Sequence, residues 1–170
     1  MLVWPLAAAS AAGDSSDSIS QNYPVKAALI YNFSKFVTWP SAAPDPTLCV
    51  SGDAAFEHYM EGTRHPNITL VSPANDDAIS GCSILYISDS DEARTSALLN
   101  HTRHHPVLTV SPEPGFADHG GIIELATMQN TIGLFSRQQS RLRINISNAQ
   151  ESGLVIDARL LQIAEVIKNK

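Results

Sequence analysis

The first strong pattern of apolar positions lies in YPVKAALIYNFSKFVTWP, residues 23–40. Apolar residues recur at the spacing of an amphipathic helix, with Pro24 suited to its first turn and Pro40 ending it. One face holds Val25, Leu29, Asn32, Phe33, Phe36 and Trp39. Lys26 and Asn32 interrupt the apolar positions. We expect a helix largely covered by protein, with Asn32 as a buried structural residue whose amide is held by hydrogen bonds. An exposed docking face is the alternative.

After this helix, strand-like and helix-like segments alternate. Strands are predicted at 48–52, 67–72, 82–88 and 106–110, with helices around 55–60 and over 91–105. The alternation is typical of a doubly wound, mainly parallel α/β sheet of order 2-1-3-4, with helices on both faces. Three more strands follow without helices, at 121–125, 131–136 and 141–147. They predict an antiparallel C-terminal extension, and a last helix is expected over 157–170.

Length and composition define the domain organisation. With 170 residues and 44% hydrophobic content, the chain can bury one sizeable core, which we place in residues 21–170. Residues 1–20, MLVWPLAAASAAGDSSDSIS, pass from an apolar piece through small residues into a polar stretch. They are typical of a signal-peptide remnant and favour export, the alternative being a disordered cytoplasmic leader.

Charge and hydropathy disfavour two classes of partner. The chain has 17 acidic and 11 basic residues, a net charge of -6, which disfavours nucleic-acid binding. It contains no apolar run of about 20 residues, so we expect no direct membrane insertion.

The two cysteines occupy matching positions in the predicted sheet. Cys49 and Cys82 lie at the starts of the first and third strands, which are parallel neighbours in the order 2-1-3-4. We therefore expect a disulfide, which also favours an oxidising compartment. By the loop-entropy model, a crosslink closing a loop of this length stabilises a protein by about 3 to 4 kcal/mol. Two buried free thiols are the alternative.

Common catalytic motifs are missing from the sequence. No lysine occurs between Lys35 and Lys168, which excludes a P-loop and the late-strand lysine of a phospho-receiver domain. There is also no G-x-S-x-G nucleophile elbow and no H-E-x-x-H zinc motif. We therefore expect neither enzymatic activity nor a cofactor.

Acidic residues follow two of the predicted parallel strands. Asp53, Asp89, Asp91 and Glu92 are expected near the carboxyl ends of the first and third strands, where α/β folds bind ligands. They suggest an alternative function, a small-ligand-binding or hydrolytic α/β domain, and a Mg²⁺ site is conceivable. Acidic residues at helix starts explain the pattern without a ligand, so no metal is predicted.

Histidines supply two further candidates. His101, His104 and His105 have a spacing that suits zinc, but they also fall in the last turn of a helix, where cationic residues are favoured. Asp118 and His119 form a candidate acid/base pair, for which a glycine-rich surface turn is the simpler explanation.

Several longer segments carry a family resemblance. These are VKAALIYNFSKFVTWP, LCVSGD, GCSILYIS, PVLTVSPEPGFADHGGIIEL and RLRINISNAQESGLVIDARLLQIAEVI. In this order they resemble the conserved blocks of the YfiR family, over residues 23–167. The resemblance implies a periplasmic regulatory protein. The best-known member binds the periplasmic part of an inner-membrane diguanylate cyclase and holds it inactive, so that cyclic-di-GMP output and biofilm formation depend on its release.

The resemblance implies a partner but no site residues. The expected partner is the periplasmic domain of a membrane-bound diguanylate cyclase or another membrane signalling protein, and a homodimer is left open. The founding member has a second cysteine pair that this chain lacks, which puts redox regulation through that pair in doubt. From the residues themselves, we expect exposed anchors for partner binding at Tyr31, Phe116, Arg137, Arg141 and Arg143.

Overall fold

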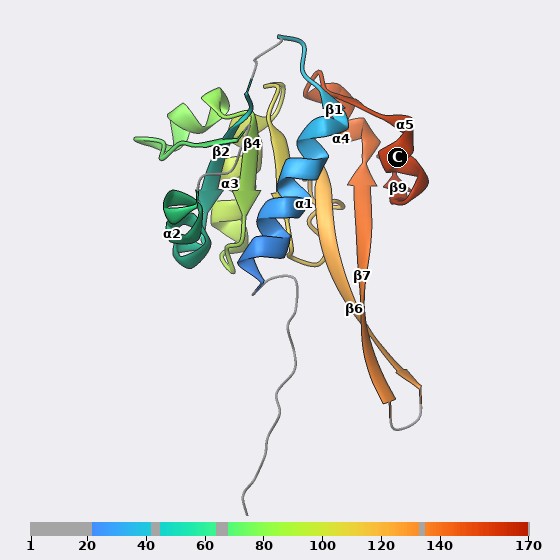
Figure 1. Cartoon of the computed structure of the whole chain (residues 1–170). Helices are drawn as coiled ribbons and strands as arrows, with labels where there is room; N and C mark the ends of the chain where they lie inside the picture. Colours follow the sequence, from blue (N-terminus) through green and yellow to red (C-terminus); the bar gives the residue numbers. More distant parts are fainter. Residues whose placement is uncertain (1–21, 42–44, 64–67, 133–134, 170) are drawn as a thin grey trace, which may run out of the picture.

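A seven-stranded sheet forms the centre of the molecule. The computed structural model describes residues 22–41, 45–63, 68–132 and 135–169. The sheet has the order β3-β2-β4-β5-β6-β7-β9 (Figure 1). Its strands are β2 (Thr47–Ser51), β3 (Thr69–Leu70), β4 (Ile84–Ile87), β5 (Leu108–Ser111), β6 (Ile123–Ile132), β7 (Phe135–Asn145) and β9 (Glu165–Ile167). Neighbouring strands pair in parallel except β6 and β7, which are antiparallel. The predicted α/β class and the order 2-1-3-4 are confirmed.

Helices cover both faces of this sheet, as predicted. Helices α1 (Tyr23–Lys35) and α2 (Ala54–Gly62) pack on one face. Helix α3 (Glu92–Thr102) and the 3-10 helix η1 (Asp76–Gly81) pack on the other. In Figure 1, α1 crosses in front of the sheet and α3 lies behind it. Along β4, Ile84 and Tyr86 join the first core while Leu85 and Ile87 join the second. Burial on both faces explains the uninterrupted apolar run of this strand.

Helix α1 is shorter than predicted and presents a different face to the core. It ends at Lys35, and β1 (Val37–Thr38) then pairs antiparallel with β8 (Val155–Ile156). Its buried residues are Lys26, Ala27, Ile30 and Phe33. Asn32 is exposed, so its predicted burial is wrong. The apolar band is so broad that the pattern alone did not decide which side contacts the sheet.

The C-terminal part departs further from the prediction. The three strands expected after residue 120 are two long strands, β6 and β7, because Ile132 and Phe135, both inside the predicted strand 131–136, pair with each other across the hairpin. Helix α4 (Ile146–Glu151) follows at once, with Asn145 as its N-cap. The predicted helix over 157–170 is also wrong beyond its first turns. Helix α5 (Ala158–Gln162) ends early, and the chain adds β9 to the open edge of β7.

The β6–β7 hairpin extends well beyond the rest of the sheet (Figure 1). β5 pairs with β6 only at Ile123 and Glu124. β9 pairs with β7 only at residues 143–145. The outer part is therefore a two-stranded ribbon attached to a compact body. Within the described residues, no helix combines the length and the apolar character needed to cross a membrane.

Candidate functional site

Cys49 and Cys82 form the expected disulfide. Cys49 lies on β2, and Cys82 ends η1 just before the adjacent strand β4, with 6.1 Å between the two Cα atoms. Both residues are buried in the core on the α3 side of the sheet. The bond thus ties the η1 segment to the centre of the sheet and closes a loop of 33 residues.

An ion pair that the sequence analysis did not predict lies inside the other core. Lys26 on α1 is only 1% exposed, and its Nζ lies 2.6 Å from Oδ2 of Asp53. The second oxygen of Asp53 accepts the N–H of Phe56 at 2.9 Å and so caps α2. One carboxylate therefore fixes the start of α2 and neutralises a buried lysine on α1.

Three aromatic rings surround the same ammonium group. The Nζ atom of Lys26 lies 5.2, 4.8 and 4.9 Å from the ring centres of Tyr23, Phe56 and Tyr86. Aromatic faces attract a cation and offset part of its lost hydration. Burial and, after it, the carboxylate of Asp53 raise the pKa of Tyr86 above its ordinary value. The signal for this site was Lys26 at an apolar position of the helix.

The acidic residues after β2 and β4 are engaged by local structure. Oδ1 of Asp91 accepts the N–H of Ala93 at 2.9 Å and caps α3. Asp89 accepts the N–H of Asp91 and lies 3.6 Å from Nε of Arg94. Together with the capping role of Asp53, these contacts favour the helix-start explanation over a Mg²⁺ site.

An open cleft remains beside the start of α3. It has a volume of about 340 Å³ and is lined by Asp89, Glu92, Leu99, Glu113, Phe116 and His119, among others. Neither Asp53 nor Asp91 lines it. The predicted acidic group therefore does not converge on one cavity.

The histidine candidates are not brought together. His101 lies 3.7 Å from Asp77, and no group of three or more His, Cys, Asp or Glu side chains in the described residues is arranged to hold a metal. His119 contacts the carbonyl oxygen of Gly115 at 2.8 Å through Nδ1. Asp118 instead accepts two hydrogen bonds from Arg143. The predicted acid/base pair is thus split between two structural contacts.

Arg143 is the centre of a second charged cluster. Its guanidinium lies 2.9 Å from both Asp118 and Glu124, and 3.7 Å from Glu165. Glu124 is only 1% exposed and also accepts the N–H of Ala117. The hydrogen bonds to Asp118 and Glu124 raise the pKa of Arg143, despite its partial burial. Arg143 therefore faces inward and holds the turn of residues 115–121 against the sheet.

Two asparagines that the sequence analysis missed fix the same turn. Asn145 donates to the carbonyl oxygen of Ala117, and Asn148 donates to that of Gly121, each at 2.8 Å. Both asparagines are buried. The available signal was a polar residue directly after the apolar end of a strand, at Asn145.

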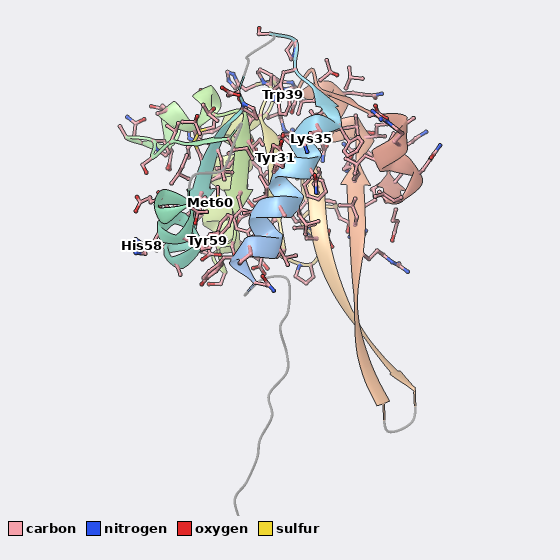
Figure 2. All side chains as sticks on the ribbon, viewed as in Figure 1. Tyr31, Lys35, Trp39, His58, Tyr59 and Met60 are labelled. Atoms are coloured by element: carbon pink, nitrogen blue, oxygen red, sulfur yellow. A yellow bond between two sulfur atoms is a disulfide. The ribbon has the colours of Figure 1, made fainter. Side chains whose placement is uncertain are left out.

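The other predicted anchors differ in exposure. Arg141 is exposed and pairs with Glu165 at 3.0 Å. Tyr31 is half-buried, with Nζ of Lys35 3.9 Å from its ring centre, and Figure 2 shows the two side chains close together on α1. Arg137 pairs with Asn130 in the ribbon, and its side chain lies outside the described part.

Phe116 was predicted as an exposed anchor, and this is wrong. It is 4% exposed and packs in the core on the α3 side. The turn brings Gly121 directly against the Phe116 ring, so closely that any Cβ at this position would collide with it. The glycine-rich segment looked like a surface loop, but its glycines allow the aromatic ring to be enclosed.

Comparison with known proteins gives one decisive match. The sequence model of the YfiR/HmsC-like family matches residues 23–165. The chain belongs to this family. No curated protein matches the chain. The match runs from the start of α1 to the first residue of β9, so it includes the buried Lys26, both cysteines and the Arg143 cluster.

Membership of the YfiR/HmsC-like family gives these clusters a context. It is a family of periplasmic regulators, not of enzymes. In such a protein, the ion pair of Lys26 with Asp53 and the Arg143 cluster hold helices and turns in place. Surfaces available for partner contact must then be sought outside these buried clusters.

Proposed function

We propose that this protein is a periplasmic repressor that binds the periplasmic domain of an inner-membrane diguanylate cyclase and holds the cyclase inactive. It thereby controls cyclic-di-GMP signalling and biofilm formation. The observation that carries the proposal is the family match over residues 23–165. The disulfide between Cys49 and Cys82 supports it, because such bonds persist in oxidising compartments such as the bacterial periplasm.

Repression through binding sets an energetic requirement. The repressor must bind the inactive cyclase more tightly than the active one, since only differential affinity shifts a conformational equilibrium. A change from mostly active to mostly inactive needs about 10⁴-fold preference, or about 5.5 kcal/mol. A few well-placed arginine and aromatic contacts in an interface are able to supply this energy.

Of the predicted anchors with described side chains, Arg141 and Tyr31 remain suitable for such contacts. Arg141 is exposed and forms a surface ion pair with Glu165, which costs little to exchange for a partner's carboxylate. Tyr31 is half-buried on α1, so part of its ring packs against the core and part is accessible.

The level of cyclic-di-GMP in bacteria with and without the gene provides a test of the proposed function. In bacteria that lack the gene, we expect the cyclic-di-GMP level and biofilm mass to rise, and the full chain to restore both. A chain without residues 1–20, retained in the cytoplasm, should not restore them. Restoration by the cytoplasmic form would contradict the proposed site of action.

Direct binding tests the proposed partner. The purified protein should bind the purified periplasmic domain of a diguanylate cyclase encoded beside its gene, as measured by calorimetry. Arg141→Glu should weaken this binding about tenfold or more. The matched control is Arg103→Glu, an exposed arginine at the end of α3. Absence of binding by the unmodified protein would reject this partner.

A further inference from the structure

The open cleft beside α3 lies at the carboxyl ends of β4 and β5, two neighbouring parallel strands. Asp89 and Ser90 follow β4, and the turn that supplies residues 113–119 follows β5. Helix α3, which connects the two strands, contributes Glu92 and Leu99 among others. Small molecules commonly bind outside the carboxyl ends of strands in α/β sheets. With a volume of about 340 Å³, this α3 cleft has room for a small organic molecule.

Part of the lining of the α3 cleft is apolar. Leu99 and Phe116 are 8% and 4% exposed and belong to the core on this side of the sheet. Pro114, from the turn after β5, adds an exposed apolar ring. Ligand sites in proteins typically combine such apolar side chains with a few polar groups that fix the orientation of the ligand. The hydrocarbon part of a ligand therefore has a surface to pack on.

Thr95 contributes a polar group that lacks a partner. Its Oγ1 atom is buried and makes no hydrogen bond within the part of the chain that the structure describes. A buried hydroxyl without a partner costs free energy, and proteins usually satisfy such a group through another residue, a water or a ligand. Since Thr95 belongs to the lining of the α3 cleft, a molecule bound there is placed to hydrogen-bond to its hydroxyl.

The charges of the lining favour a cation. Asp89, Glu92 and Glu113 line the α3 cleft, and its lining contains no Lys or Arg. Asp89 is partly neutralised by Arg94, whose Nε lies 3.6 Å from it. Among the described residues, neither Glu92 nor Glu113 has an ion-pair partner. The other ionisable group is His119, whose Nδ1 atom contacts a backbone carbonyl oxygen at 2.8 Å.

The start of α3 does not make the cleft suitable for an anion. The first N–H groups of a helix bind phosphates and carboxylates when they have no other partner. Here Oδ1 of Asp91 accepts the N–H groups of both Ala93 and Arg94. An anion in the cleft would therefore find these donors occupied and would face three carboxylates.

We propose that the α3 cleft binds a small organic cation, a molecule that joins an ammonium group to an apolar body such as an aromatic ring. The carboxylates of Glu92 and Glu113 attract the ammonium group, and the apolar body packs on Leu99 and Phe116. This site does not depend on the proposed cyclase partner, so either proposal can fail without the other.

Titration of the purified protein with 2-phenylethylamine tests the proposal first. Calorimetry at low salt should give a dissociation constant of about 1 mM or lower. The matched control is 3-phenylpropionate, which has the same ring and the same two-carbon chain but ends in a carboxylate. It should bind at least about tenfold more weakly, because its charge is repelled by the lining. Equal affinities for the two compounds, or no binding of the amine at about 10 mM, would overturn the proposal.

Removal of one carboxylate tests the role of charge. Glu113→Gln keeps the size of the side chain and should raise the dissociation constant of 2-phenylethylamine about fivefold or more. Glu61→Gln, at an exposed position of α2 outside the cleft, is the control and should leave it unchanged. Circular dichroism should show that both variants are folded. The same affinity in both variants would show that Glu113 does not hold the cation.

A pair of bulky substitutions tests the location independently of charge. Ser96 and Ala97 are both exposed on α3, but Ala97 is not part of the lining. Ser96→Trp should fill the cleft and weaken the binding of 2-phenylethylamine about tenfold or more, whereas Ala97→Trp should bind it as the original chain does. If the two tryptophan variants bound the amine equally well, the site would lie elsewhere and the proposal would be wrong.

Discussion

The Nζ atom of Lys26 lies 2.6 Å from Oδ2 of Asp53, although the two residues are 27 positions apart in the sequence. This contact joins α1 to the start of α2 inside the core. The ammonium group and the carboxylate neutralise each other in an interior from which water is largely excluded, so removal of either one leaves a buried, unpaired charge. Substitution of either residue alone should therefore destabilise the fold.

Lys26→Met should lower the free energy of unfolding by about 3 kcal/mol, because it leaves the carboxylate of Asp53 without its cation. Urea denaturation measures this change. Adding Asp53→Asn should recover much of the loss, since asparagine still caps α2 and carries no charge. Lys35→Met, at an exposed position of the same helix, is the control. A loss as small as that of the control would show that the pair contributes little.

Burial of the Tyr86 hydroxyl should make the free energy of unfolding depend on pH in the alkaline range. Its pKa in the folded protein is raised by burial and by Asp53, whereas in the unfolded chain it is about 10. Above this pH the unfolded chain loses the proton and the folded protein keeps it. The free energy of unfolding should then fall by about 1.4 kcal/mol per pH unit as the pH rises. In Tyr86→Phe this component should disappear, and equal slopes for both proteins would refute the assignment.

If Cys49 and Cys82 are bonded, the protein should contain no free thiol and should lose stability when the bond is reduced. Thiol titration of the denatured, unreduced protein should detect no free thiol. Reduction should lower the free energy of unfolding by about 3 to 4 kcal/mol, because the crosslink restricts the unfolded chain. The double variant Cys49→Ser and Cys82→Ser should show a similar loss and no response to reductant. Two titratable thiols in the exported protein would contradict the bond.

Removal of Arg143 should lower the free energy of unfolding, because it leaves the buried carboxylate of Glu124 without its cation. Arg143→Met should destabilise the protein by about 3 kcal/mol, whereas Arg141→Met, which breaks a surface pair, should cost about 0.5 kcal/mol. Glu124→Gln introduced into Arg143→Met should restore most of the loss, because the amide oxygen still accepts the N–H of Ala117. Equal effects of the two single arginine variants would argue against the inward role of Arg143.

The leader should be dispensable for folding, because its composition cannot bury a core. A chain that begins at Gln21 is expected to unfold with the same midpoint and the same cooperativity as the full chain in thermal denaturation. A drop of about 5 °C or more in the midpoint would show that residues 1–20 contribute to the fold.

Much of the parallel half of the sheet could be predicted from local patterns. Buried strands such as β4 are short apolar runs, and the alternation with helices determines how they connect. The disulfide followed from the same reasoning, since Cys49 and Cys82 were expected at the starts of strands that this topology makes neighbours. Helix caps at Asp53 and Asp91 were also open to prediction, because they depend on nearby residues.

The candidate contact residues could be predicted much less well. Phe116 and Arg143 were placed at the surface, and the structure encloses one and turns the other inward. Their positions depend on a turn that hydrogen-bonds to Asn145 and Asn148, more than 25 residues further along the chain. Local patterns contain no information on such distant contacts.

The sequence by itself therefore determined the fold class, the strand order of the parallel half and the family, because these depend on periodicity and on ordered segments along the chain. Only the tertiary structure decided which side of α1 is buried, where the long hairpin turns and that β9 replaces the end of a helix. In each of these cases several local conformations were compatible with the residues. Burial of Lys26 against Asp53 and pairing of β9 with β7 selected one of them.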